Sequence, residues 1–290
     1  MGKFIVSFRR QGTITPGQPS TPSVSDLVEL GILTKQVSEF TNSDIGTTVL
    51  IPYNDPTGKI LLNNGNIEFE VVGVNHHKDT NNADTPTITL MTKNIIRKAA
   101  FDAKEPDNPD STRKANGNNR WSVSNIRQWL NSSGAAGSWF TKQHDYDEPP
   151  TSDHIYDSDG AYAGDPGFLV GFSDEVIQHF TDITNTTLLH ELDRVGSETS
   201  ETTVDKVFLP SYTEMGFGNN NGIAEGAPLF TDGYSIVKST EYVYYWLRSN
   251  SSGETSTTYS HDCGGLGRDG LGNYPSYFGV IGIAPIIVLH

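Results

Sequence analysis

The sequence has one cysteine, few basic residues and no long apolar run. Cys263 has no second cysteine with which to form an intrachain disulfide or a multi-cysteine zinc site, and a free thiol is typical of a chain that folds in a reducing cytosol. No apolar run approaches the ~20 residues that a membrane span needs, and residues 1–6 lack the apolar core of a signal peptide. Work outside a cell would therefore require an exit route other than classical secretion.

Positive charge is also scarce. The chain carries 35 acidic residues against 20 lysines and arginines, for a net charge of -15. This balance argues against nucleic acid as a partner, because phosphate binding needs clustered basic side chains. It equally disfavours adsorption to an anionic membrane surface. The 290 residues, 35% of them hydrophobic, are enough to bury a core in one large or two modest domains.

The start of the chain differs in pattern from the rest. Residues 3–9 alternate well enough for a short strand, and residues 12–23 are rich in Pro, Gly, Ser and Thr, as in an extended linker. A short helix is predicted over 25–31. We therefore expect residues 1–36 to form an N-terminal arm and residues 37–290 to form the main domain.

The sequence of the main domain predicts a mixture of strands, short helices and long loops. Two helices are well specified, over 122–130 and 173–180, because each follows a serine that can cap it and buries one apolar face. The other expected elements are strands at 48–51, 69–74, 87–91, 207–209, 242–248 and 283–289, a partly helical stretch at 93–101, and a long loop at 103–119. This order indicates an α+β fold, since the regular βαβ alternation of a parallel sheet is missing.

Two segments resemble metal sites. His76, His77 and Asp79 are close in sequence, but adjacent residues on a strand point to opposite faces, so a polar strand end is the preferred interpretation. Residues 153–160 resemble a calcium loop, yet Ile155 stands at the first ligand position, which rules out an EF-hand. A looser calcium site in this loop stays open.

Catalytic signals are weak throughout. Cys263 lies two residues from His261, but no helix N-terminus is evident that would lower the pKa of the thiol. Residues 264–270 resemble a dinucleotide fingerprint without opening an apolar helix, so turns are the better interpretation. No spacing of acidic pairs identifies an acid/base dyad. We expect no catalytic residue, no metal and no cofactor.

The polar stretch that follows the predicted strand 242–248 is the best candidate for a binding site. It is rich in Ser, Asn, Gly and Tyr, the residues that adaptable binding loops favour, and a strand is predicted on each side of it. A surface loop whose rings lie on the core is the alternative. The predicted ligand-binding residues are Asn250, Ser252, Thr255, Tyr259, His261, Asp262, Asp269, Asn273, Tyr274 and Tyr277.

Four motifs, in order, resemble an uncharacterised domain family that is common in tailed-phage structural proteins. They comprise residues 44–46 with 69–72, the segment 118–130 with its Trp-Ser-Val-Ser-Asn-Ile-Arg-Gln-Trp-Leu helix, the Phe-Leu-Pro-Ser turn at 208–211, and Trp-Leu-Arg-Ser at 246–249 followed by the ending at 277–289. The resemblance covers residues 40 to 289. An arginine typical of the family's ending is missing here, which puts the register of the last strand and a structural ion pair in question.

The resemblance implies a C-type-lectin-like fold, related to that of formylglycine-generating enzymes, with its ligand face near the C-terminal strands. The copper chemistry of the enzyme branch needs two cysteines, which this chain lacks. The expected function is that of a virion protein, made in the bacterial cytoplasm and released by lysis. Its arm would contact other virion proteins, and its domain would bind a bacterial surface glycan, with affinity raised by homo-oligomerisation or display in many copies.

Two other classes of function remain open. The chain would be a capsid or tail decoration protein if the polar loops contact neighbouring subunits. It would be a glycan-cleaving enzyme if a carboxylate dyad, which the sequence does not reveal, were present.

Overall fold

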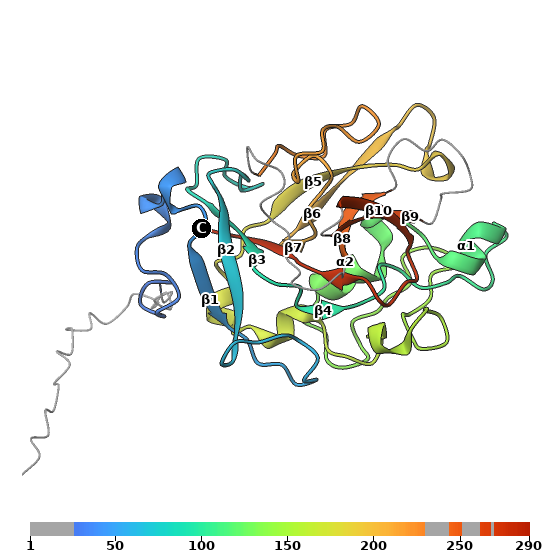
Figure 1. The fold of residues 1–290 in the computed structure, drawn as a ribbon, viewed down its shortest axis with the longest axis horizontal. Coiled ribbons are helices and arrows are strands. Elements are labelled where there is room, and N and C mark those ends of the chain that lie inside the picture. The colour runs from blue at the N-terminus through green and yellow to red at the C-terminus, as the bar shows by residue number, and fades with distance from the viewer. Residues whose placement is uncertain (1–25, 230–243, 251–261, 268–269) are drawn as a thin grey trace, which may run out of the picture.

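The computed structural model describes residues 26–229, 244–250, 262–267 and 270–290, with the backbone alone described for residues 262–267 and 270–271. In this part of the chain the strands form two five-stranded sheets and one two-stranded ribbon (Figure 1). The sheets are mostly antiparallel and are accompanied by short helices, so the fold is α+β, as the sequence predicts. Among the described residues, no helix is long and apolar enough to cross a membrane.

The first sheet is antiparallel throughout and has the order β1-β2-β3-β12-β7. Its strands are β1 (Thr48–Pro52), β2 (Asn66–Val74), β3 (Ile88–Thr92), β12 (Ile286–Leu289) and β7 (Val207–Phe208). On β1, Val49 and Ile51 point into the core while their neighbours are exposed, which is the alternation of a strand with one solvated face. β12 is buried along its whole length because it lies between β3 and β7.

The second sheet has the order β10-β9-β8-β11-β4. Its strands are β10 (Gly270–Pro275), β9 (Asp262–Gly267), β8 (Tyr245–Asn250), β11 (Gly282–Ile283) and β4 (Arg97–Lys98). β11 runs parallel to β8, where Gly282 faces Tyr245, and the other pairs are antiparallel. Since only Ala284 and Pro285 separate β11 from β12, the end of the chain joins the two sheets.

The remaining elements cover these sheets. β5 (Ile183–Leu188) and β6 (Ser200–Asp205) form the ribbon. The α-helices are α1 (Ser111–Asn116), α2 (Asn125–Leu130) and α3 (Asp174–Ile177). The 3₁₀ turns are η1 (Val37–Glu39), η2 (Asn42–Asp44), η3 (Trp121–Val123), η4 (Ser158–Gly160), η5 (Phe168–Gly171) and η6 (Glu191–Asp193). Figure 1 shows α1 at the end of the molecule opposite to β1.

The tryptophans of the recognised motifs are structural. Trp121, Trp129 and Trp246 are buried, and each indole N–H donates a hydrogen bond. The acceptors are a carboxylate oxygen of Asp205 at 3.1 Å, the carbonyl of Pro166 at 2.8 Å and the carbonyl of Ala99 at 2.8 Å. A buried indole contributes a large apolar area and needs such a partner for its polar edge. These motif residues therefore fix the core and are not available to a ligand.

Most predicted elements of the main domain are confirmed. The strands at 48–51, 69–74, 87–91 and 207–209 correspond to β1, β2, β3 and β7. The helix at 122–130 is α2, capped by the Ser124 hydroxyl, which accepts from the backbone N–H of Arg127. The helix at 173–180 is reduced to the four residues of α3 and a following turn.

Three local predictions are wrong. Residues 93–101 contain no helix, because Arg97 and Lys98 pair with β11 as β4. The predicted loop 103–119 contains α1, whose first turn is held by the Asp110 side chain accepting from two backbone N–H groups. Residues 26–31 form turns and no helix, ending at Gly31 with a positive φ of 72°.

The described part of the predicted N-terminal arm packs on the domain. Leu27, Ile32 and Leu33 are buried and belong to the same apolar core as the two sheets. Residues 1–25, with the predicted strand and linker, lie outside the described residues. A separate arm would therefore be confined to residues 1–25.

Candidate functional site

Of the residues that the sequence predicts to bind a ligand, Asn250, Asp262, Asn273 and Tyr274 lie on the adjacent strands β8, β9 and β10. Asn250 is buried, and its side-chain amide donates to the carbonyl of Leu188 at 3.1 Å, so it supports the fold beneath the surface. Tyr274 is half-buried with its ring 4.8 Å from that of Tyr244, while Asn273 is exposed on β10. The backbone of Asp262 lies in β9. Ser252, Thr255, Tyr259, His261 and Asp269 lie outside the described residues.

Tyr277 belongs to an aromatic patch made of Tyr156, Tyr277 and Phe278. The Tyr156 ring lies 5.1 Å from Phe278 and 6.4 Å from Tyr277, and the last two rings are 5.1 Å apart. Tyr156 is 55% exposed, and the other two are half-buried. Rings held this close at a surface offer flat apolar faces beside polar hydroxyl groups, an arrangement suited to binding.

The backbone holds the aromatic patch rigidly. The N–H of Tyr156 donates to the carbonyl of Tyr277 at 2.9 Å, and the N–H of Gly279 donates back to the carbonyl of Tyr156 at 2.7 Å. Gly160 and Gly279 let the two segments approach closely, because a Cβ added at Gly160 would overlap the Cα and carbonyl oxygen of Gly279. The patch is therefore a product of tertiary pairing between residues 156–160 and 277–279.

Charged groups border the aromatic patch. The Lys104 ammonium lies 4.5 Å from the centre of the Tyr277 ring, within the range of a cation–π contact. Asp157 and Asp159 are exposed on the neighbouring turn, and the Asp157 carboxylate accepts the Asp159 N–H at 3.1 Å. Sequence reasoning missed Tyr156, Phe278 and Lys104. The one signal in the sequence that could have indicated this patch is the tyrosine at 156, which lies among acidic residues in the segment 153–160.

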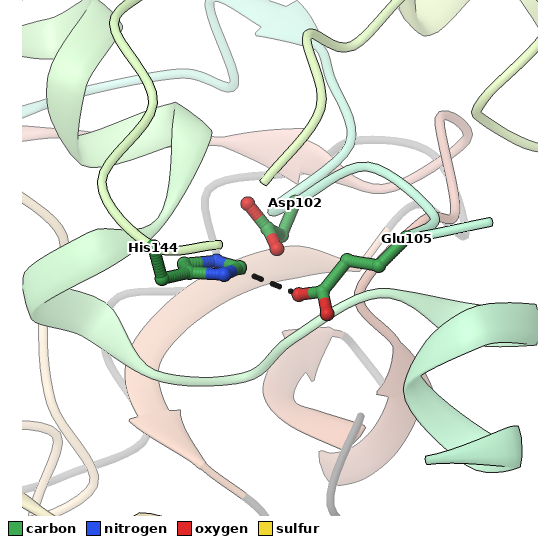
Figure 2. A group of neighbouring side chains, drawn as sticks. All are labelled: Asp102, Glu105 and His144. Carbon is green, nitrogen blue, oxygen red and sulfur yellow. Dashed lines mark ion pairs between the residues drawn. The ribbon is translucent and has the colours of Figure 1, made fainter. Parts of the chain in front are cut away.

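A second group of polar side chains, here called the acid cluster, consists of Asp102, Glu105, His144 and Asp147. Its three carboxyl groups belong to residues that are at most 1% exposed, and the His144 side chain is 24% exposed. Figure 2 shows the carboxyl groups of Asp102 and Glu105 and the His144 ring converging on one space. Among the described residues, no lysine or arginine forms an ion pair with these carboxyl groups.

Hydrogen bonds fix most of the cluster. Asp102 accepts the backbone N–H groups of Asn118 at 3.1 Å and Asn125 at 2.9 Å. The Asn125 side chain links the two aspartates. It donates to the Asp147 carboxylate at 3.0 Å and accepts from the backbone N–H of Ala103, the residue after Asp102, at 3.0 Å. Asn125, the first residue of α2, is thus tied to both aspartates of the cluster.

Burial dominates the electrostatics of these groups. It raises the pKa of Glu105 to about 7 and that of Asp147 to about 6. The pKa of Asp102 is raised well above its usual value by burial and then by the neighbouring charges of Asp147 and Glu105. Burial, followed by the charge of Arg113, lowers the pKa of His144. The site therefore disfavours the charged form of each of its own groups.

The histidines of the segment 76–79, which resembles a metal site in the sequence, have other partners. The ring nitrogens of His77 lie 3.0 Å from a Glu214 carboxylate oxygen and 3.0 Å from the Thr89 hydroxyl, while His76 contacts the carbonyl of Ala227 at 3.1 Å. In the part of the chain that the structure describes, Asp102, Glu105 and His144 are the group whose ligand atoms are close enough to share one ion.

Comparison with known families assigns most of the chain. The model of a family described as a domain of unknown function, DUF6273, matches residues 86–289. The chain therefore belongs to this family. The matched region contains the recognised motifs from residue 118 onward, the aromatic patch and the acid cluster. Comparison with curated proteins and with solved structures finds no match.

Proposed function

We propose that this member of the DUF6273 family is a virion protein whose domain binds a bacterial surface polymer through the aromatic patch. The observation that carries the proposal is the exposed ring cluster of Tyr156, Tyr277 and Phe278, with Lys104 at its edge. The virion setting and a C-type-lectin-like ancestry rest on the sequence motifs. The α+β architecture and the position of Tyr277 and Phe278 shortly before the last strands are compatible with both.

The patch fits a carbohydrate better than an apolar ligand. Sugar rings present C–H faces that pack on aromatic rings and hydroxyl groups that need polar partners. Here the rings supply the faces, and Asp157, Asp159 and the Lys104 ammonium supply acceptors and a donor at the rim. A patch of three rings would bind weakly per domain, and display in many copies would raise the affinity.

The charge of the protein narrows the polymer class. A net charge of -15 repels polyanions at low ionic strength. We therefore infer a neutral wall polysaccharide as the ligand and not a phosphate-rich polymer. Residues 1–25 remain the segment proposed to contact other virion proteins, because Leu27, Ile32 and Leu33 are committed to the core.

Binding to purified wall polysaccharide tests this proposal. The full chain, immobilised at high density, should retain neutral polysaccharide, and Tyr156→Ala should lower the apparent affinity at least about tenfold, ~1.4 kcal/mol. Tyr212→Ala is the control, since the half-buried Tyr212 packs on Phe217 outside the patch.

Two results would overturn the proposal. One is the absence of retention on every polysaccharide tried, together with tight association of the chain with particles that lack it, which would indicate a decoration protein. The other is equal retention of wild type and the Tyr156→Ala variant. Shortening of the polysaccharide during incubation would point instead to a glycan-cleaving enzyme.

A further inference from the structure

The acid cluster contains two polar atoms that face each other without a hydrogen bond. Glu105 is fully buried, and its Oε1 accepts no hydrogen bond. The ring of the partly exposed His144 directs Nε2, which also has no hydrogen-bond partner, at this oxygen. The two atoms are 3.5 Å apart (Figure 2). A buried carboxylate oxygen without a partner is costly, so it indicates a group that the protein chain does not itself supply.

We propose that Asp102, Glu105 and His144 bind one divalent first-row transition-metal ion such as zinc or manganese. This inference is independent of the proposed polysaccharide site, because it rests on other side chains.

The spacing of the ligand atoms fits such an ion. One ligand atom from each of the three residues lies within 4.8 Å of the others. Zinc binds imidazole nitrogen and carboxylate oxygen at ~2.0–2.2 Å, so two ligands at a tetrahedral angle are separated by about 3.4 Å. The 3.5 Å between Glu105 Oε1 and His144 Nε2 matches this value, and an Asp102 oxygen lies within the same 4.8 Å group.

The chemistry of the ligands selects the kind of ion. An imidazole with two carboxylates suits zinc, manganese or iron, whereas calcium prefers six to eight oxygen ligands. Two ionised carboxylates would neutralise the double charge of the ion. The cluster lacks an arginine or lysine pair within the described part of the chain, so the ion would take the place of a basic side chain.

Outer contacts hold two of the ligands in place. Asn108 donates its side-chain amide to Glu105 Oε2, which leaves Oε1 directed at the site. Asp102 is oriented by the backbone N–H groups of Asn118 and Asn125, and a carboxylate oxygen that accepts one such bond keeps a lone pair for a metal. The partly exposed His144 ring marks the side from which an ion would enter.

The site would stabilise the segment that carries Lys104. Residues 102–105 include two of the three ligands, and the backbone N–H of Asp102 donates to the carbonyl of Ser276, next to Tyr277 in the aromatic patch. An ion bound here would connect this segment to the loop at 144–147. It would therefore act on stability, with no requirement for contact with substrate.

Titration of the full chain with Zn²⁺ and Mn²⁺, after treatment with a chelator, tests the proposal. We expect one equivalent to bind and to raise the unfolding temperature. His144→Ala and Glu105→Gln should each weaken the affinity at least ~10-fold. His179→Ala and Asp107→Asn, a histidine and an exposed acid outside the cluster, should bind like wild type.

Two binding results would contradict the metal site. Failure of wild type to bind either ion, or equal binding by wild type and His144→Ala, would overturn the proposal. Because Glu105→Gln alters a buried residue, its fold is first checked by circular dichroism. If it is unfolded, the partly exposed His144 decides the result alone, and X-ray absorption of the zinc-loaded wild type must show one imidazole ligand. Two imidazoles would place the ion at another histidine pair and contradict the assignment.

Discussion

The guanidinium of Arg248, on β8, forms a two-point ion pair with the carboxylate of Glu214, at 2.5 and 2.8 Å. Both side chains are 1% exposed. The same guanidinium donates to the carbonyls of Leu209 and Glu225, and His77 contacts Oε1 of Glu214, one of the two oxygens that bind Arg248. This network lies under the end of β8, where the Trp-Leu-Arg-Ser motif ends, and it shows that the motif's arginine serves the core.

Replacing one member of this pair should destabilise the protein strongly. Glu214→Gln leaves Arg248 buried without a counter-charge, a change that typically costs about 3–5 kcal/mol. Urea unfolding of wild type and variant measures the difference in the free energy of unfolding. A loss below ~1 kcal/mol would contradict the structural role assigned to the pair.

The pair also predicts how stability depends on pH. The positive charge of Arg248 and the contact with His77 hold the pKa of Glu214 well below its usual range, in spite of its burial. The unfolded chain binds this proton near pH ~4.3, so the contribution is complete above that pH and is lost as the pH falls below it. Unfolding measured from pH 6 to pH 3 should show a smaller loss for Glu214→Gln than for wild type. Parallel curves would contradict the expectation.

Close approach of two glycines should be essential to the aromatic patch. Gly160→Ala forces a methyl group against the backbone of Gly279, and overpacking of this kind costs roughly 1–3 kcal/mol. The variant should be less stable in thermal unfolding and should also bind polysaccharide less tightly. Gly164→Ala is the control, because a Cβ there meets nothing within 4 Å. Equal effects of the two substitutions would show that the contact is unimportant.

The burial of Leu27, in the segment before residue 36, gives a test of whether this segment belongs to the domain. Leu27 is 2% exposed within the main core, so Leu27→Ala should lower the free energy of unfolding by about 2–5 kcal/mol. Glu29→Ala, at an exposed position two residues away, should change it by less than ~0.5 kcal/mol. If Leu27→Ala were equally mild, this segment would be an appendage, as the sequence suggests.

The sequence indicates the elements of this fold better than its site. The alternating pattern locates β1 because one-sided burial is a local property of a strand. Ser124 marks the start of α2 because a cap is also a local feature. β4 is missed because its two residues are fixed by pairing with β11, which follows some 185 residues later and leaves no local pattern.

The site depends on the same kind of distant contact. Tyr156 and Tyr277 come together through backbone hydrogen bonds between remote segments, and Asp102, Glu105 and His144 meet only after folding. Composition pointed to the polar stretch after residue 248, in which Asn250 proves to be buried at the end of β8 and Tyr277 lies in the patch. A strand residue's side chain can face either way, and the composition of a loop does not reveal which of its rings stay exposed.

Hydrogen–deuterium exchange of the full chain, with and without neutral wall polysaccharide, tests the central claim most directly. We expect slower exchange at residues 153–160 and 275–279, which carry the aromatic patch, and unchanged exchange in β1 and β2. Binding that slows exchange elsewhere, and leaves these two segments unaffected, would contradict the assignment of the patch as the ligand site.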